Sequence, residues 1–519
     1  MGKEVELKFE VPPGVARHLA SLPALHRNGG PAQENNLVSV YFDTPKHKLR
    51  KNGLSLRVRH IGNKRLETIK ANGNSGAGLF SRDEWEKSIG SDTPDLRGAR
   101  HSPLGALLTK KLKRALKPVF ETRVHRTVLP LEDGGSRIEV TLDRGQVRHG
   151  RKSAPINEVE LELKRGKPAD LFRVARDLTR RVPARLSVRS KADRGYDLVA
   201  HKPVAAAAKG EKIALPPDVS TADALRAIAA ASLRQVVANE PAVRAGDPEG
   251  IHQMRVGLRR LRAAISLFGD LLDDPQTKRI KRELKWLTDE LGPARDLDVY
   301  IRSSIRPLRR ELQSKSPGLP PKPGLQELEK GLEARRARAF NQARKAVGSE
   351  RYRALMLDTL RWLESGDWAM SGGKDARARR ERSARAFARE EIGRRVKKAR
   401  KKAKHLADLD PRQRHKLRIA VKKLRYAGDF FESLFLRRKA AKRLRRFEGR
   451  LKKLQDRLGA LNDIAVHQRL ARDLAGENGR KRALTVGVVA GREQCRIEPL
   501  RAAAVKAADK FRRARPYWM

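Results

Sequence analysis

The chain has 519 residues, of which 34% are charged and 39% hydrophobic, and its formal net charge is +56. This length predicts at least two domains, because a domain typically holds about 150 residues. The excess of positive charge favours polyanionic partners: nucleic acid, an anionic membrane surface or polyphosphate. A single cysteine, Cys495, excludes an internal disulfide framework and fits a reducing compartment.

The sequence predicts no targeting segment and no membrane span. Glu4, Glu6 and Lys8 fall where the apolar region of a signal peptide would have to lie. No apolar run approaches the ~18 residues that a membrane span needs. We therefore expect a cytoplasmic protein without a membrane partner.

The first predicted strand, from Glu4 to Phe9, alternates charged and apolar residues. Because successive side chains of a strand point to opposite faces, Glu4, Glu6 and Lys8 share one face. Residues 158–164 repeat this alternation. A solvated sheet face would explain either strand alone. Two acidic strands side by side need positive charge between them, which a divalent cation or a substrate carrying one would supply.

The same alternation recurs between these two strands. Further strands are predicted at residues 38–43, 54–59, 66–70, 81–86, 119–129 and 137–143, with helices at 13–22, 102–117 and 168–182. A solvated sheet face remains one explanation. Since Arg, Lys and Glu dominate the alternate positions, the pattern favours charged faces turned inward around a polar channel. Such a channel binds phosphate oxygens through Arg and Lys, and Mg²⁺ or Mn²⁺ through clustered Glu.

The charged strands contain a series of short motifs in a fixed order: Glu4-x-Glu6-x-Lys8, Tyr41-Phe42-Asp43-Thr44, Leu56-Arg57-Val58-Arg59, Thr68-x-Lys70, Arg82-x-Glu84, Phe120-x-Thr122-x-x-x-Arg126, Leu142-Asp143-x-Gly145, Glu158-x-Glu160-x-Glu162 and Ser190-Lys191-x-x-Arg194-Gly195-Tyr196. In this order the motifs resemble the CYTH family of triphosphate tunnel metalloenzymes over residues 1–200. The resemblance implies an eight-stranded antiparallel β tunnel with flanking helices, which hydrolyses or rearranges triphosphate-bearing substrates with a divalent metal. The order of the motifs most resembles the bacterial inorganic triphosphatases. Class IV adenylate cyclases and thiamine triphosphatases share the scaffold.

Under this resemblance the charged residues take three roles. The cations that would clamp the phosphates are Lys8, Arg57, Arg59, Lys70, Arg126 and Lys191. The ligands of one or two ions of Mg²⁺ or Mn²⁺ would be Glu4, Glu6, Glu158 and Glu160. Further ligands, or the catalytic base that activates water, would be Glu84, Asp143 and Glu162. A surface ion pair is the alternative for any one of these residues.

Arg123 is an alternative to Arg126 as the cation that binds phosphate. The two lie three residues apart, so a regular strand places them on opposite faces. The family motif favours Arg126.

The second half of the chain has a helical pattern and an internal repeat. Residues 201–217 have the composition of a linker, and a helical domain is expected over 218–510. His252-x-Met254-Arg255-Val256-x-x-Arg259-Arg260-Leu261-Arg262 matches His415-x-Leu417-Arg418-Ile419-x-x-Lys422-Lys423-Leu424-Arg425, and Leu291-Gly292-x-x-Arg295-Asp296 matches Leu458-Gly459-x-x-Asn462-Asp463. These matches predict two copies of one helical unit, at about 218–310 and 380–475.

Each copy carries a basic stripe, because positions i, i+3, i+7 and i+10 share a helix face. The stripes are His252, Arg255, Arg259 and Arg262, and His415, Arg418, Lys422 and Arg425. One stripe alone would suit a solvated face, but its repetition favours a ligand groove, with Asp296 and Asp463 as anchors of the arginines. One His per helix, without a carboxylate at metal-ligand spacing, argues against a metal site. This half resembles the CHAD domain, a helical domain often fused to CYTH and associated with binding inorganic polyphosphate.

The sequence thus predicts an α+β multidomain enzyme, an inorganic triphosphatase joined to an all-α polyphosphate-binding module, in the cytoplasm and associated with polyphosphate granules. The alternatives are a non-catalytic polyphosphate-binding or granule-targeting protein, a nucleic-acid-binding protein and a class IV adenylate cyclase. Nucleic acid is not favoured, because single-strand binders add aromatic platforms and aromatic residues are only 5% of this chain.

Overall fold

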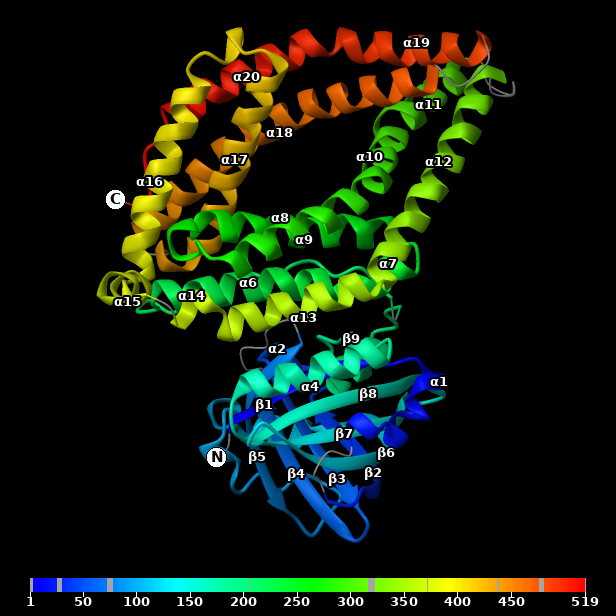
Figure 1. Cartoon of the computed structure of the whole chain (residues 1–519), viewed down its shortest axis with the longest axis vertical. Helices are drawn as coiled ribbons and strands as arrows, with labels where there is room; N and C mark the ends of the chain where they lie inside the picture. Colours follow the sequence, from blue (N-terminus) through cyan, green and yellow to red (C-terminus); the bar gives the residue numbers. More distant parts are fainter. Residues whose placement is uncertain are drawn as a thin grey trace. The chain divides into compact units, whose positions relative to one another are not determined.

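A computed structural model of the chain describes residues 3–25, 30–71, 78–203, 205–315, 323–370, 372–435, 438–475 and 480–518. The chain divides into two compact units (Figure 1). Unit 1 holds Met1–Gly210, Ala230–Gly257 and Ala346–Met370. Unit 2 holds Glu211–Ala229, Leu258–Lys345 and Ser371–Met519.

The strands of unit 1 form one antiparallel sheet that closes on itself (Figure 1). They are β1 (Lys3–Glu10), β2 (Gln33–Asp43), β3 (Leu54–Ile61), β4 (Lys64–Ala71), β5 (Leu79–Ser88), β6 (Lys117–Asp133), β7 (Ser136–His149), β8 (Lys152–Arg165) and β9 (Arg185–Leu186). Their order is β5-β4-β3-β2-β6-β7-β8-β1-β9, and β1 also pairs with β5. Strands β1 to β8 therefore make the predicted closed tunnel, and the two-residue strand β9 adds to β1 outside that ring.

The two acidic strands predicted to need positive charge between them are direct neighbours. In the pairing of β1 with β8, Glu6 lies opposite Glu162 and Lys8 lies opposite Glu160. The alternate residue Leu7 is fully buried on the other face. The charged faces of β1 and β8 therefore lie on the same side of the sheet.

The apolar faces of the strands pack outward under the connecting segments. Leu56, Val58 and Ile69 from β3 and β4 form one buried cluster. Leu104 and Leu112, which follow β5 in the chain, cover this cluster. Burial of these aliphatic side chains stabilises the ring from outside, at roughly 25 cal/mol per Å² of apolar surface, and leaves the interior to polar groups.

Helix α5 (Lys191–Val199) is fixed closely against β6, β7 and β8. Its start is set by a capping box, in which the Ser190 side chain accepts the Asp193 amide and the Asp193 carboxylate accepts the Ser190 amide. Gly195 permits the close approach, because a Cβ at this position would lie 2.1 Å from the Phe120 ring. The helix therefore places Lys191 at a defined point on the tunnel.

Other helices of unit 1 only partly follow the sequence prediction. The helix expected at 168–182 is confirmed as α4 (Pro168–Arg181), which packs on β8 and on α13 (Glu350–Ser365). The helix expected at 102–117 is wrong in length, since only α3 (Lys110–Ala115) is helical there in the α form. Pro103 and Gly105 disfavour a helix interior. The helix expected at 13–22 is likewise reduced to α1 (Pro13–Ala16) and a 3₁₀ turn.

Unit 2 is built from helices, as the sequence predicts for this half (Figure 1). They include α9 (Pro275–Glu290), α10 (Gly292–Tyr300), α11 (Arg306–Lys315), α12 (Pro323–Gly348), α16 (Ala384–Ala403), α17 (Pro411–Phe431), α18 (Arg438–Ala475), α19 (Arg480–Cys495) and α20 (Ile497–Arg512). Helices α6 (Thr221–Ala238), α8 (Pro248–Leu267) and the last residues of α12 cross the boundary between the units. Within the described parts of the chain, no helix has an apolar stretch long enough to cross a bilayer.

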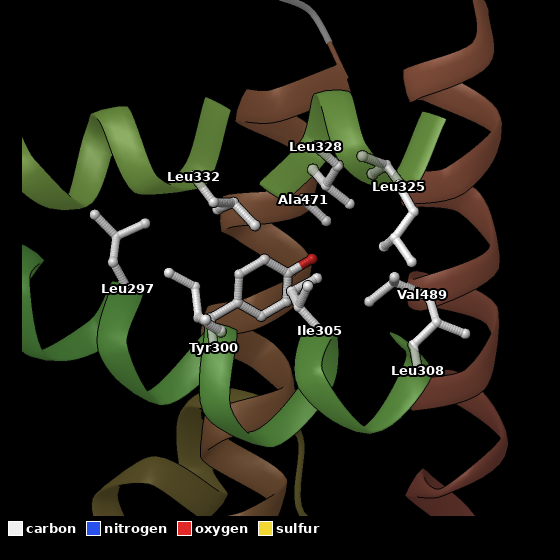
Figure 2. Packing of buried hydrophobic residues seen from close by; sticks show 11 residues of the cluster. Leu297, Tyr300, Ile305, Leu308, Leu325, Leu328, Leu332, Ala471 and Val489 are labelled. Atoms are coloured by element: carbon white, nitrogen blue, oxygen red, sulfur yellow. The ribbon is translucent and has the colours of Figure 1, made fainter. Parts of the chain in front are cut away.

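One core of unit 2 joins α10, α11, α12, α18 and α19 (Figure 2). A π-helical turn, Ile301–Ile305, links α10 to α11. Tyr300, Ile305 and Leu308 on this continuous stretch pack against Leu328 of α12 and Val489 of α19.

The two copies of the repeat differ where the sequence changes. In the first copy Pro293 lies at the start of α10, so the chain breaks into α9 and α10 at Leu291. In the second copy Ala460 takes the equivalent place, and α18 runs through it without interruption. A proline removes an amide donor and ends a preceding helix, which explains the difference.

Candidate active site

A cavity of about 630 Å³ lies inside the ring of strands, and every strand from β1 to β8 contributes to its wall. The charged side chains that line it are Glu6, Lys8, Arg50, Arg57, Arg59, Lys70, Glu84, Glu86, Arg126, Glu139, Glu160, Glu162, Lys164, Lys191 and Asp193. This arrangement confirms that the charged faces turn inward. We call this space the tunnel cavity.

The six predicted substrate-binding cations all line the tunnel cavity, as do Glu6, Glu84, Glu160 and Glu162. Asp143 and Glu158 lie behind its wall, each 1% exposed. The side chain of Glu4 falls outside the described residues. Arg123 is not among the residues that line the cavity and pairs with Glu121 at 2.8 Å, whereas Arg126 lines the cavity.

Lys191 is the centre of the ion-pair network. Its Nζ lies 2.7 Å from Asp143 Oδ2, 2.8 Å from Glu158 Oε2 and 2.8 Å from Glu160 Oε1. Burial acts to lower the pKa of Lys191, but the three carboxylates outweigh it and raise this pKa well above its usual value. Lys191 therefore stays protonated, and its charge offsets the repulsion among the three acids.

Two further cations complete the neutralisation. Arg126 donates two hydrogen bonds to Asp143, at 2.8 and 2.7 Å, and lies 3.4 Å from Glu160. Lys8 Nζ lies 2.6 Å from Glu160 and 3.8 Å from Glu158. Although burial opposes ionisation of Glu160, Lys191 and Lys8 outweigh it and hold the pKa of Glu160 well below its usual value. The positive charge expected between the acidic strands thus comes from the protein's own side chains.

The opposite wall carries a cation of a different kind. Arg59 Nε donates to Ser39 Oγ at 3.3 Å. Among the described residues, no carboxylate lies within ion-pair distance of Arg59. Burial, together with the neighbouring Arg57 and Arg126, lowers the pKa of Arg59 to about 9, against the opposite effects of Tyr41 and Asp143. Arg59 is therefore a half-buried cation whose charge the protein offsets only in part.

Two residues beside Arg59 shape this wall. Arg57 lies 3.6 Å from Glu84, which also pairs with Lys70 at 3.0 Å. Tyr41 borders the cavity and its ring stacks on Phe120 at 4.6 Å. Burial acts to raise the pKa of Tyr41, but the nearby Arg57 and Arg59 outweigh it and lower this pKa. The wall is thus a rigid, strongly positive surface.

Asp143, Glu158 and Glu160 form the one carboxylate group among the described residues that could hold a metal ion, with one oxygen from each within 4.8 Å of the others. Carboxylate oxygens suit hard divalent cations. The Lys191 ammonium lies within 2.8 Å of each. A metal bound to all three would therefore have to displace Lys191.

Unit 2 contains a second group of cations, which we call the basic cluster: Arg259, Arg418, Lys422 and Arg425. Burial lowers the pKa of Lys422 to about 7, and Arg418 and Arg259 act in the same direction. Burial likewise lowers the pKa of Arg418, against the opposite effect of Asp463. The structure therefore brings parts of the two predicted basic stripes within electrostatic range of each other.

The remaining stripe residues lie elsewhere. Arg262 is exposed, and His415 is exposed with its Nδ1 2.8 Å from Asn462 Oδ1. His252 and Arg255 belong to unit 1. The predicted anchors Asp463 and Asp296 both lie near enough to Arg418 to counter the fall in its pKa.

Comparison with known protein families matches both halves of the chain. The model of the CYTH domain matches residues 2–196, and the model of the CHAD domain matches residues 227–472. The chain holds a CYTH domain followed by a CHAD domain, and it belongs to the CHAD family. The tunnel cavity lies in the CYTH domain, and the basic cluster lies in the CHAD domain.

Relatives of known sequence match one domain or the whole chain. An inorganic triphosphatase of Haemophilus influenzae is 34% identical over 204 residues, which are 38% of this chain and 55% of that protein. An uncharacterized protein of Mycobacterium tuberculosis is 27% identical over 99% of this chain and 98% of its own length. The crystal structure of the CHAD domain from the plant Ricinus communis shares 30% identity, covers 60% of this chain and 98% of the solved chain, and superposes with a TM-score of 0.51.

Sequence reasoning gave no role to several residues in or behind the wall of the CYTH tunnel. Tyr41 lines the cavity and Arg194 pairs with Glu158 behind its wall, and both belong to quoted motifs. Glu139 shares a strand face with Asp143, and Lys164 shares one with Glu160 and Glu162, so the alternation could have found both. Arg50 carries no signal in the sequence that separates it from surface residues.

Proposed function

We propose that the CYTH domain hydrolyses inorganic triphosphate in the tunnel cavity with a divalent metal ion. The observation that carries this proposal is Arg59, a half-buried cation on the cavity wall with no carboxylate at ion-pair distance among the described residues. Burying such a charge is unfavourable unless a counter-ion pairs with it. A triphosphate supplies several negative charges in a row. The kinship of this domain with the Haemophilus influenzae inorganic triphosphatase supports the same substrate.

In the proposed reaction, water attacks a terminal phosphorus of triphosphate. A new P–O bond forms, the bridging P–O bond breaks, and orthophosphate and pyrophosphate leave. Arg57, Arg59, Lys70 and Arg126 would bind the oxygens of the phosphate chain and offset the charge that repels an attacking water. Glu84 or Glu162, both on the cavity wall, would take the proton from the water.

The metal, Mg²⁺ or Mn²⁺, would bind where carboxylates of β1 and β8 meet. Glu6 and Glu160 face the cavity, and we assign Glu4 and Glu158 to the same ligand set, with Asp143 as a further ligand. The bound ion would neutralise phosphate oxygens and lower the pKa of a water molecule. Lys191 and Lys8 lower the pKa of Glu158 and Glu160 and so keep both carboxylates ionised, and a metal bound to Asp143, Glu158 and Glu160 together would take the place of Lys191.

We also propose that the CHAD domain binds inorganic polyphosphate at the basic cluster. Burial lowers the pKa of Lys422 and of Arg418, so an anion at the cluster would relieve an unfavourable accumulation of charge. The residues would be Arg259, Arg418, Lys422 and Arg425, and the exposed Arg262 and His415 of the same unit would bind further phosphates of the chain. Polyphosphate held there would keep substrate close to the enzyme, in the cytoplasm or at polyphosphate granules.

Orthophosphate release by the full chain tests the tunnel proposal. Tripolyphosphate, ATP and thiamine triphosphate should be compared, each with Mg²⁺ and with Mn²⁺. We expect the fastest release from tripolyphosphate and none with a chelator. Arg59→Ala should abolish most of the release, whereas Arg123→Ala, a change on the outer face of β6, should leave it intact. Equal rates in the two variants would overturn the assignment.

A further inference from the structure

Unit 1 contains a second pocket beside the tunnel cavity. Its volume is about 330 Å³, and it is bordered by β1, β8, α5 and the segment after α5. This volume is at the small end of the range for ligand sites. None of its lining residues lines the tunnel cavity. A small ligand could therefore occupy the second pocket while the tunnel is filled.

The lining of the second pocket is strongly positive. Five basic residues, Arg185, Arg189, Arg194, Lys202 and Arg244, face two carboxylates, Glu10 and Asp197. These two carboxylates are shared among several cations, and a third carboxylate behind the pocket, Glu240, lies 3.6 Å from Arg185 Nε. Asp197 lies 2.7 Å from Arg189 and 3.6 Å from Lys202, and Glu10 lies 2.5 Å from Arg194 and 4.0 Å from Arg185.

Two of these contacts are too long for hydrogen bonds. The pairs of Lys202 with Asp197 and of Arg185 with Glu10 exceed 3.5 Å. The side chain of Lys202 is 57% exposed and that of Arg185 is 25% exposed, so solvent ions reach both. A guanidinium presents five donors in a planar fork that matches the oxygens of a phosphate group. The pocket thus offers donors and positive charge to a small tetrahedral oxyanion.

Arg194 connects the second pocket to the tunnel. Its Nη2 reaches Glu10 in the pocket, and its Nε donates to Glu158 Oε1 at 2.9 Å. The other oxygen of Glu158 lies 2.8 Å from Lys191, which lines the tunnel cavity. All of these side chains are buried or half-buried. Two ion pairs, Arg194 with Glu158 and Glu158 with Lys191, therefore connect an anion in the pocket to the wall of the tunnel cavity.

We propose that the second pocket binds a phosphate oxyanion, orthophosphate or pyrophosphate, and that the bound anion draws Arg194 away from Glu158. Loss of this ion pair would shift Glu158 toward Lys191 and change the tunnel carboxylates that hold the metal. Both anions are products of the proposed hydrolysis, so the regulatory part of this inference rests on the proposed function. The binding part does not.

Calorimetric titration of the full-length protein with orthophosphate, without metal, tests the binding. The pocket variant Arg185→Ala/Lys202→Ala should lose one bound phosphate per chain, while Arg59→Ala in the tunnel and Lys422→Met in the basic cluster should each retain it. A repeat with pyrophosphate tells which product fits better. Unchanged stoichiometry and affinity in the pocket variant would overturn the site, whatever the protein hydrolyses.

A second variant guards against a folding defect. Lys202→Glu changes an exposed side chain, should leave the unfolding temperature unchanged, and should weaken phosphate binding at the pocket at least tenfold. For the regulatory part, orthophosphate should lower the maximal hydrolysis rate of the wild type but act only by competition in the pocket variant. Identical inhibition in both proteins would exclude the coupling through Arg194, and absence of any hydrolysis would count against the proposed function alone.

Discussion

The tunnel holds two kinds of cation, the buried Lys191 and the half-buried Arg59, and they differ in what surrounds them. Lys191 lies among three carboxylates, so its charge is part of the folded structure. Arg59 has a serine hydroxyl as its neighbour and its pKa falls to about 9. Lys191 thus acts as a structural cation, whereas Arg59 is available to a ligand.

Replacement of Arg59 should separate affinity from stability. Arg59→Ala removes a hydrogen bond to a charged ligand, typically about 1.5–3 kcal/mol, so binding of tripolyphosphate should weaken about 10- to 100-fold. Because Arg59 has no carboxylate at ion-pair distance among the described residues, its loss breaks no ion pair there, and the unfolding temperature should stay the same or rise. Calorimetric titration without metal and thermal unfolding measure both. A fall of the unfolding temperature with unchanged affinity would assign Arg59 a structural role.

Replacement of Lys191, in contrast, should lower the stability of the fold. Lys191→Met leaves three buried carboxylates without their shared cation, and breaking a buried ion pair costs about 3–5 kcal/mol. The unfolding temperature should fall sharply, and Mg²⁺ or Mn²⁺ should restore part of it by taking the place of the ammonium. Thermal unfolding with and without metal gives the result. The control, Lys164→Met, removes a half-exposed pair with Glu162 at 2.7 Å and should change stability by less than about 1 kcal/mol.

At the scale of single elements, α5 carries Lys191, Arg194 and Gly195 and so links the tunnel cavity to the second pocket. Gly195→Ala would place a methyl group 2.1 Å from Phe120, so α5 must shift and hydrolysis should fall together with the unfolding temperature. Gly449→Ala is the matched change, because nothing lies within 4 Å of that position in α18 and alanine favours a helix by up to ~1 kcal/mol. Equal effects of the two changes would show that the packing of α5 on Phe120 does not matter.

Lys422 of helix α17 should make polyphosphate binding by the CHAD domain depend on pH. Lys422 has a pKa of about 7 in the folded protein, and its charged neighbours are Arg418, Arg259, Arg425 and Asp463. As the pH rises through about 7, Lys422 loses its proton and the basic cluster loses one charge. Binding of long-chain polyphosphate should therefore weaken between about pH 6 and pH 8.5. Lys422→Arg should bind equally across this range, since arginine keeps its charge, and a wild type without pH dependence would contradict the assignment.

The folding stability depends on pH in the opposite direction to polyphosphate binding. The folded pKa of Lys422 lies below the ordinary lysine value of 10.5. Between these two pH values the unfolded chain holds one proton more than the folded chain. The contribution of Lys422 to stability therefore rises with pH from about 7 to about 10.

Alternation of side chains along the strands made the interior of the tunnel predictable, and it separated Arg126 from Arg123. It could not show that Lys191, from a helix, would meet Asp143 and Glu158, because that meeting depends on the capping box and on the close packing of Gly195. The helix predicted at 102–117 was too long, because the helical pattern alone takes no account of Pro103. The second pocket carries no linear motif, since its residues come from separate elements.

On the scale of the whole molecule, the net charge of +56 comes from two different arrangements. In the CYTH domain, cations and carboxylates alternate inside a closed sheet and mostly pair with one another. In the CHAD domain, arginine and lysine cover helix faces, and the basic cluster is only partly offset by acids. The Mycobacterium tuberculosis relative spans 99% of this chain, so the same two-domain order occurs elsewhere. We infer that catalysis and polyanion binding are divided between the domains.

The central claim is that carboxylates inside the tunnel bring a metal to a bound triphosphate. The direct measurement is metal-dependent release of orthophosphate from tripolyphosphate by the full chain, compared between the wild type and Glu160→Gln at equal folded fractions. Glu160 contacts Lys8, Lys191 and Arg126, and its amide replacement keeps the shape but removes the charge. We predict release by the wild type that requires Mg²⁺ or Mn²⁺ and a loss of at least 100-fold, roughly 3 kcal/mol, in the variant. Release that persists in Glu160→Gln, or that needs no metal, would contradict the account.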